Sequence, residues 1–295
     1  MTTLVAGATG RIGGATLAAL IEADREPIAL LRSPGRAPAL PHPVDWRVGD
    51  LAHPRSLAEA FESVQTLLLC SGHAPTMAQL QLNAITAARS AGVQRIVKIS
   101  TSPASAFAGT PSQVAAQHLE IEAALAASGI EHTNIRPNAF AQLIGGFAQG
   151  IARGELELTL ADAAVSWVDA MDVGRVAAAA LIAGGPLPTR IEVTGPQALS
   201  GDQLAELLTK ATGRPVSYRP ISDERNRARL VAAGAPEWLA EHVITIFALL
   251  RDRDGDRVTH AVHEWTGRPA TSMAEVLARD EGQLGITAAV TAGRA

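Results

Sequence analysis

The chain has 295 residues, of which 47% are hydrophobic and 18% charged, so it can bury a large core. The formal net charge is -4 and the charges are scattered, which argues against nucleic acid or an anionic membrane as a partner. A lone cysteine, Cys70, excludes an internal disulfide and suits a reducing cytoplasm. No Cys/His spacing indicates a metal site, and no apolar run approaches the ~20 residues of a membrane span. We therefore expect a soluble, cytoplasmic protein without a metal.

Strand-like and helical patterns alternate from the first residues onward. Apolar runs typical of strands are separated by stretches with helical spacing, and one of these, 54–61, opens on Ser56-Leu-Ala-Glu59. Such alternation predicts the α/β class, with a Rossmann-type doubly wound parallel sheet and helices on both faces. The expected strands cover 3–6, 27–31, 46–48, 66–70, 95–100 and 132–136, and the expected helices 11–23, 54–61, 77–91 and 112–127.

The pattern changes after residue 137. We expect residues 1–137 to form the dinucleotide-binding core and 138–286 a smaller, mostly helical lobe on the substrate side. Within this lobe, 165–195 should return to the core with a further strand at 191–194, and 236–250 should form a long helix. Ser200 with Gln203, and Ser272 with Glu275, have the spacing of capping boxes. The last residues, 287–295, are predicted to be a flexible tail.

The strongest local signal is a glycine motif between the first strand and the first helix. Gly7, Gly10 and Gly13 are spaced one residue wider than the usual dinucleotide fingerprint. Glycines here allow a tight turn and a close approach of the backbone to a pyrophosphate at the helix N-terminus. The segment therefore predicts cofactor contacts at Gly7, Thr9, Gly10, Arg11, Ile12 and Gly13. The alternative is that these glycines serve only tight packing of helix on strand.

Cofactor choice is expected where the second strand ends. An acidic residue there would bind a ribose 2′-hydroxyl, whereas arginine accommodates a 2′-phosphate. This chain has Arg32 and no carboxylate in the stretch, with Arg11 or Arg36 as a second arginine. Guanidinium binds phosphate with bidentate, charge-assisted bonds, so we predict NADP(H) rather than NAD(H). The alternative is that these arginines merely face solvent.

Together these residues identify the chain as similar to a known family, the NmrA-like branch of the atypical short-chain dehydrogenases/reductases, which includes quinone and triphenylmethane reductases. The resemblance implies an NAD(P)H-dependent oxidoreductase acting on a small-molecule substrate, with a homodimer left open. Some members instead bind NADP(H) as regulators or redox sensors. Besides the glycine motif, the resemblance rests on Gly49-Asp50-Leu51, Ser56-Leu, Gly92-Val93, Val97 to Ser100, His118 to Glu122, Ser128-Gly-Ile, Arg136 to Phe140, Trp167 to Asp169, Asp172-Val and Thr266 to Pro269.

The resemblance also implies roles for individual residues. Asp50 and Leu51 would flank the adenine, with Asp50 accepting a hydrogen bond from its amine. Two short segments, 70–72 and 100–101, would line the nicotinamide end of the cofactor. Pro137 and Asn138 would border both the nicotinamide and the substrate. Alternatively, Asp50 only caps its turn and Cys70 is only a small buried residue. The two segments consist of Cys70, Ser71 and Gly72, and of Ser100 and Thr101.

The catalytic residues differ from those of most short-chain dehydrogenases, which use a Tyr-x-x-x-Lys pair. Here the only tyrosine is Tyr218, in a strand-like segment of the C-terminal lobe, and the only lysines are Lys98 and Lys210. His118 becomes the candidate, as a ligand of the nicotinamide or a proton donor, with Asn138 beside it. Alternatively, His118 pairs with Glu122, four residues on, to hold the helix on the sheet.

Two functions follow as hypotheses. The first is an NADPH-dependent reductase that transfers hydride to a quinone-like or other conjugated small molecule, an acceptor that needs little catalytic assistance. The second is a non-catalytic NADP(H)-binding regulator or redox sensor. An open apolar pocket above the nicotinamide would favour the first, and a cleft plugged by side chains the second.

Overall fold

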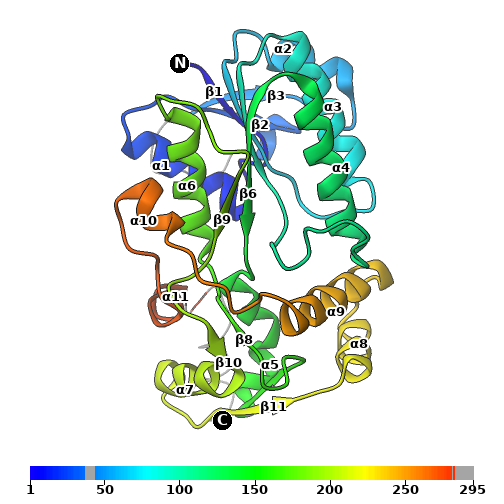
Figure 1. Cartoon of the computed structure of the whole chain (residues 1–295), viewed down its shortest axis with the longest axis vertical. Coiled ribbons are helices and arrows are strands. Elements are labelled where there is room, and N and C mark those ends of the chain that lie inside the picture. Colours follow the sequence, from blue (N-terminus) through cyan, green and yellow to red (C-terminus); the bar gives the residue numbers. More distant parts are fainter. Residues whose placement is uncertain (37–43, 281, 283–295) are drawn as a thin grey trace.

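The computed structural model describes residues 1–36, 44–280 and 282, and its central feature is a seven-stranded parallel sheet (Figure 1). The strand order is β3-β2-β1-β4-β5-β6-β9, and every neighbouring pair is parallel. This confirms the predicted fold class and each predicted strand, within one or two residues at the ends. The strands are β1 (Thr3–Val5), β2 (Ile28–Leu31), β3 (Asp45–Val48), β4 (Thr66–Leu69), β5 (Arg95–Ile99), β6 (Glu131–Pro137) and β9 (Arg190–Val193).

Helices cover both faces of this sheet, which is why β4 and β5 are buried along their whole length. One face carries α1 (Arg11–Glu22), α6 (Ala170–Ile182) and α10 (Ala261–Thr266). The other carries α2 (Leu57–Ala60), α3 (Met77–Ser90) and α4 (Gln113–Ser128) (Figure 1). α1 and α6 pack so closely that a Cβ on Gly174 would collide with Ala15.

The remaining elements gather beyond one end of the sheet, around a separate apolar cluster that includes Trp167, Phe147 and Phe247. They include an antiparallel pair, β8–β10, and a parallel pair, β7–β11. We propose on this basis the division into 1–137 and 138–286, with 165–195, which contain α6 and β9, returning to the core. α10 also returns to the sheet, which the sequence did not predict. The elements are η3 (Ala141–Phe147), α5 (Ala148–Ala152), β7 (Glu155–Leu158), β8 (Ala164–Val165), β10 (Leu199–Ser200), α7 (Gly201–Thr212), β11 (Ser217–Pro220), α8 (Asp223–Ala232), α9 (Glu237–Asp252) and α11 (Met273–Asp280).

The predicted helix starts have mixed outcomes. Ser200 and Gln203 form the expected capping box of α7. Ser272 and Glu275 make the same reciprocal bonds before α11. Ser56, the last residue of the short helix η2 (Pro54–Ser56), is the N-cap of α2 as expected, but its hydroxyl does not cap that helix and instead bonds the backbone of Asp50 and His53. The predicted tail, 287–295, lies outside the described residues, and none of the described helices could cross a membrane.

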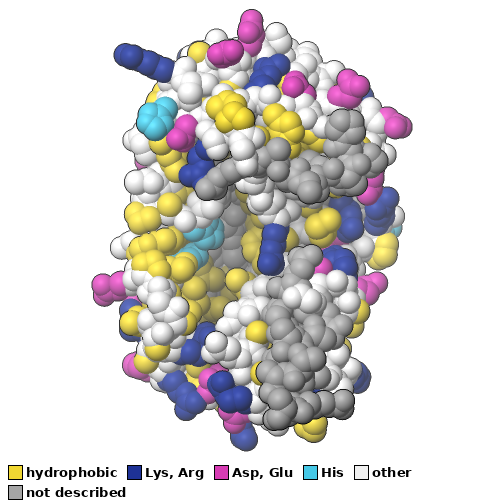
Figure 2. All heavy atoms as spheres, turned by 180° about the vertical axis from the view of Figure 1, so that it is seen from behind, with side chains coloured by type: hydrophobic (Ala, Val, Ile, Leu, Met, Phe, Trp, Pro, Cys, Tyr) yellow, Lys and Arg dark blue, Asp and Glu magenta, His cyan; other side chains and the backbone are white. Residues whose placement is uncertain are grey.

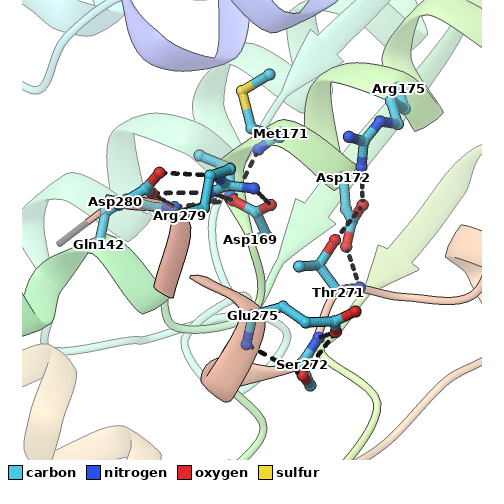
Figure 3. Close-up of polar contacts among 11 residues, drawn as sticks. Gln142, Asp169, Met171, Asp172, Arg175, Thr271, Ser272, Glu275, Arg279 and Asp280 are labelled. Carbon is cyan, nitrogen blue, oxygen red and sulfur yellow. Dashed lines mark hydrogen bonds and ion pairs between the residues drawn. The ribbon is translucent and has the colours of Figure 1, made fainter. Parts of the chain in front are cut away.

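An ion pair between a buried carboxylate and a partly exposed arginine fastens α11 to the start of α6 (Figure 3). Asp169, the N-cap of α6, is fully buried and accepts hydrogen bonds from Arg279 at 2.6 and 3.1 Å. Its Oδ1 also accepts from Gln142 of η3 at 2.8 Å. Burial alone would raise the pKa of Asp169, but these hydrogen bonds outweigh it and lower that pKa. Figure 3 also shows Asp172, one turn along α6, accepting from Thr271. α11 is thus anchored to the start of α6 and, because Gln142 also donates to Asp280 at 3.2 Å, to η3.

Candidate active site

A cavity of about 820 Å³ opens at the carboxyl ends of β1, β2, β3 and β4. The strand order reverses between β1 and β4, and ligands of open α/β sheets bind at such a switch point. Figure 2 shows a hollow on one face of the molecule, flanked by hydrophobic and histidine side chains. Eleven of the predicted cofactor residues line the cavity: Gly7, Thr9, Gly10, Arg11, Ile12, Arg32, Asp50, Leu51, Cys70, Ser71 and Gly72.

The glycine motif forms one wall of the cavity. Gly7 has a φ of +77°, and a Cβ there would lie 2.5 Å from the carbonyl oxygen of Cys70. Gly10 donates its N–H to the Gly7 carbonyl at 2.9 Å. Gly13 does not line the cavity, and a Cβ at this position would collide with the Gly7 carbonyl. Gly13 therefore serves the packing of helix on turn, while Gly7 and Gly10 shape the wall.

The N-terminus of α1 faces this wall without a side-chain cap. Gly10 is the N-cap, and the first turn contains no acidic residue. The leading N–H groups of a helix are unsatisfied within the helix and carry a partial positive charge. Arg11, the first residue of α1, adds a full positive charge at the same place. The site suits a dinucleotide pyrophosphate, whose oxygens would bind these N–H groups.

Arg32 and Asp50 stand on the rim formed by the ends of β2 and β3. Asp50 Oδ1 accepts from the backbone N–H of Ala52 at 2.9 Å, and Oδ2 lies 3.1 Å from His53 Nδ1. The hydrogen bond from Ala52 is the main reason that the pKa of Asp50 is lowered, with His53 and Arg32 contributing. Asp50 thus caps its own turn and also lines the cavity, while its contact with the adenine stays a prediction.

The loop after β4 forms the opposite wall. Ser71 accepts a hydrogen bond from the buried Gln81 at 2.9 Å, which fixes the loop on α3. Burial raises the pKa of the Cys70 thiol to about 11, so at neutral pH it is an unreactive thiol. His73, the next residue after the predicted segment, also lines the cavity.

The cavity is not lined by three of the other predicted residues, Ser100, Thr101 and Pro137. The Ser100 hydroxyl donates to Glu122 at 2.6 Å, and Thr101 bonds Ser105 at 2.9 Å. Pro137 ends β6 in the core. The side chain of Arg36 lies outside the described residues. Ser100, Thr101 and Pro137 are therefore placed to support the strand ends, and a direct contact with the nicotinamide stays a prediction.

Asn138 is buried and its amide is fully engaged. It donates to the Ser166 hydroxyl at 2.7 Å and to the Gly255 carbonyl at 2.8 Å, and its oxygen accepts from Ser102 at 3.1 Å. It does not line the cavity. These bonds tie the end of β6 to segments far along the chain, which suits positioning rather than contact with substrate.

His118 is also buried, and the alternative reading, a pairing with Glu122, is wrong. Glu122 is taken by Arg136 of β6, at 2.5 and 3.1 Å, and by Ser100. His118 Nδ1 instead lies 2.8 Å from Lys98 Nζ on β5. The pKa of His118 is well below its usual range because of burial first and the nearby Lys98 second. His118 is therefore neutral in the folded protein near pH 7.

Sequence reasoning missed the segment after β6 and the residues next to Gly72. His73 could have been found by extending the loop after the fourth strand by one residue. Phe140 belongs to a motif that carried the family resemblance. Gln142 and Leu143 follow it in η3, a segment whose sequence shows no recognisable pattern. The cavity residues not predicted include His73, Ala74, Thr76, Leu80, Phe140, Gln142, Leu143 and Ala170.

The sheet, the glycine turn and the uncapped helix define a dinucleotide-binding protein. A family model described as NAD(P)H-binding matches residues 7–182. Over 274 residues the chain is 36% identical to an NAD(P)H azoreductase of Xenophilus azovorans, covering 92% of this chain and 95% of that protein. The chain therefore belongs to the NAD(P)H-binding family, in its NmrA-like atypical short-chain dehydrogenase/reductase branch.

Solved structures agree with this assignment. The NADPH-dependent quinone oxidoreductase QOR2 of Escherichia coli, complexed with NADPH, has a TM-score of 0.86 at 26% identity, covering 94% of this chain and 99% of that one. The Citrobacter sp. triphenylmethane reductase complexed with NADP(H) has a TM-score of 0.83 at 26% identity, with the same coverage. The predicted family and its nicotinamide dinucleotide cofactor are confirmed.

Proposed function

We propose that this protein uses NADPH to reduce a quinone-like or other conjugated small molecule. The observation that carries the proposal is the open cavity, whose wall continues from the glycine turn to the side chains of His73, Phe140 and Leu143. Phe140 and Leu143 are apolar and suit a flat conjugated ring. The similarity to an azoreductase and a quinone oxidoreductase supports the same class of acceptor.

The chain's own residues would act mainly by holding two reactants together. When bound, NADPH supplies the hydride. The turn at Gly7 and Gly10 would hold the pyrophosphate, and the apolar wall would exclude water from the acceptor. Tyr218 cannot act as the catalytic tyrosine, because it lies on β11, where its hydroxyl donates to the Ala161 carbonyl at 2.9 Å.

The direct test is NADPH consumption with a panel of quinones, azo compounds, enones and cationic dyes. We expect turnover with at least one quinone or azo compound, and unchanged turnover in Tyr218→Phe. His118→Ala should lower kcat about 10²-fold, the lower end of the range for one acid-base group. NADPH affinity is measured in parallel to separate binding from chemistry. Tight NADPH binding without turnover of any acceptor would contradict the reductase and favour the regulator.

Arg32 should determine the preference for NADPH over NADH. It lies on the cavity rim at the carboxyl end of β2, where a 2′-phosphate is expected. Arg32→Ala should weaken NADPH binding by about 1–3 kcal/mol and leave NADH binding nearly unchanged. Arg25→Ala, just before the opposite end of the same strand, is the matched control and should alter neither affinity. Equal affinities for the two dinucleotides in the wild type, by calorimetry, would refute the assignment.

A further inference from the structure

Lys98 is a charged residue in the middle of the sheet, and the proposed function does not use it. Its side chain is fully buried. The Nζ atom donates to the Ile99 carbonyl at 3.1 Å and lies 2.8 Å from His118 Nδ1. Among the described residues, no carboxylate forms an ion pair with it. An unpaired buried ammonium costs several kcal/mol, so its place here calls for a function.

The groups around Lys98 and His118 determine whether the proton is on the lysine amine or on the imidazole. Burial lowers the pKa of Lys98 to about 7, with Glu122 and Cys70 raising it and Arg136 lowering it. The pKa of His118 is well below its own usual value because of burial and the nearby Lys98. Below pH 7 the proton therefore sits on Lys98. The titratable and charged groups around the pair are Cys70 at the end of β4, Glu122 on α4, Arg136 on β6, His73 in the loop after β4 and His242 on α9.

The contact with Lys98 fixes the hydrogen on the other side of the His118 ring. An ammonium has only donors, so His118 Nδ1 must accept, and the ring hydrogen is then on Nε2. Nε2 is buried and has no hydrogen-bond partner among the described residues. A buried donor without a partner costs about 1–3 kcal/mol, a cost that a transient proton acceptor would remove.

His73 connects this ring to the cavity. Its ring packs edge-on against His118, with centroids 5.7 Å apart, and His73 itself lines the cavity. On its other side His242 of α9 packs at 4.9 Å. Three imidazoles, from the loop after β4, from α4 and from α9, therefore pack together at His73, and Lys98 contacts the ring of His118.

We propose that Lys98 and His118 form a proton-donating pair for the reduction, with His73 as the last ring before the acceptor. This rests on the proposed function. Lys98 is a positioning residue, which sets the His118 tautomer and restores its proton. Two-electron reduction adds a hydride and a proton to the acceptor; NADPH provides the hydride.

Proton transfer requires the His73 ring to turn until one of its nitrogens accepts from His118 Nε2, because the two rings are in edge-on contact and Nε2 has no hydrogen-bond partner among the described residues. The Nε2–H bond then breaks as His73 accepts this proton and releases its other N–H proton to the acceptor. A Lys98 Nζ–H bond breaks at the same time as His118 Nδ1–H forms, so that His118 stays neutral. After the reaction a proton from water in the cavity returns through His73 to His118 Nε2, and the Nδ1 proton goes back to Lys98.

A proton-donating pair of Lys98 and His118 favours the reduction of one class of acceptor. Quinones and azo compounds gain an O–H or N–H bond when they are reduced, so they need the proton as well as the hydride. A cationic triarylmethane dye is reduced by hydride alone and would gain nothing from Lys98. The preferred substrates are therefore acceptors whose electron-accepting atom is an oxygen or nitrogen that must be protonated.

The first test follows the pair itself and needs no substrate. Only two lysines are present, so protein labelled with [ε-¹³C]lysine gives two side-chain signals, and Lys210→Met, an exposed position on α7, assigns them. We expect the Lys98 signal to titrate with a midpoint near pH 7, and ¹⁵N-histidine spectra to show His118 with hydrogen on Nε2 below that pH. A Lys98 signal that does not titrate between pH 5 and 9, or a His118 hydrogen on Nδ1, would overturn the proposal.

The second test follows the reaction. With 1,4-naphthoquinone, wild-type kcat should fall as the pH rises through about 7, because the donating ammonium is lost. Lys98→Met should lower kcat about 10- to 100-fold and abolish this pH dependence, with NADPH affinity and Tm retained. Lys210→Met should behave as wild type. A Lys98→Met variant with the wild-type pH profile would overturn the transfer step. Failure of every acceptor would reject the proposed function but leave the spectroscopic result standing.

Discussion

Gly10→Val should abolish NADPH binding while the protein remains folded. Gly10 has φ -87° and ψ 167°, a backbone conformation that valine adopts readily. Its Cβ would lie 3.2 Å from the Gly7 carbonyl, and the branched methyl groups would occupy the space that a pyrophosphate must enter. Losing two or more charge-assisted hydrogen bonds costs about 3 kcal/mol or more, which is on the order of a 100-fold loss of affinity.

The neighbouring helix glycine provides a matched control. At Gly14 a Cβ would meet only the Ala8 carbonyl, at an ordinary 3.6 Å. Gly14→Ala should keep NADPH affinity and raise stability by up to about 1 kcal/mol, because alanine favours the helix. Both variants are measured by NADPH fluorescence titration and thermal unfolding. Wild-type affinity in Gly10→Val would mean that the phosphates bind elsewhere.

Arg279→Met should destabilise the protein by about 3 kcal/mol, the lower end of the usual effect of leaving a buried charge without its partner, because Asp169 is fully buried while the Arg279 side chain is 39% exposed. The carboxylate of Asp169 is fully buried and would keep only Gln142 and the Met171 N–H as donors. Asp280, which shares the same arginine, would also lose its partner. Urea unfolding followed by tryptophan fluorescence measures the change.

Arg268→Met is the matched control for this pair. Arg268 lies 3.6 Å from Glu22, and both side chains are more than 60% exposed, so the pair should contribute little. The pKa of Asp169 is lowered in the fold, so its stabilising contribution is present at neutral pH and lost as the pH falls through the folded value. The difference between wild type and Arg279→Met should therefore shrink below about pH 3.9. A loss no larger than that of Arg268→Met would refute the role of the pair.

The sequence predicts the sheet and the phosphate end of the site because both depend on local pattern. The alternation of strands and helices, the glycines at 7, 10 and 13, and Arg32 after the second strand are all read within short windows. Lys98 carries a partial signal, since it interrupts an apolar strand that a parallel sheet buries on both faces. Its partnership with His118 depends on which helix covers which strand, so no spacing reveals it.

The helical spacing of His118 and Glu122 does not make these two residues partners. The two residues are four apart on α4, but Arg136 from β6 supplies a full, permanent charge to Glu122, which a neutral histidine cannot match. The same limit applies to Asp169 and Arg279, which are 110 positions apart and meet only once α11 docks. Side chains that combine across distant elements were the part of the site that the sequence did not predict.

The bonds of Gln142 have a consequence for protein synthesis. Gln142 lines the cavity, and its amide donates a hydrogen bond to Asp169. Arg279 of α11 binds the same carboxylate. A chain emerging from the ribosome can pair the strands around the glycine turn long before residue 279 is made, since N-terminal units generally fold first. The cavity wall at Gln142 is complete only after α11 has docked and Arg279 has bound Asp169. The dinucleotide end of the pocket is thus formed early in translation, and the acceptor end becomes rigid among the last steps.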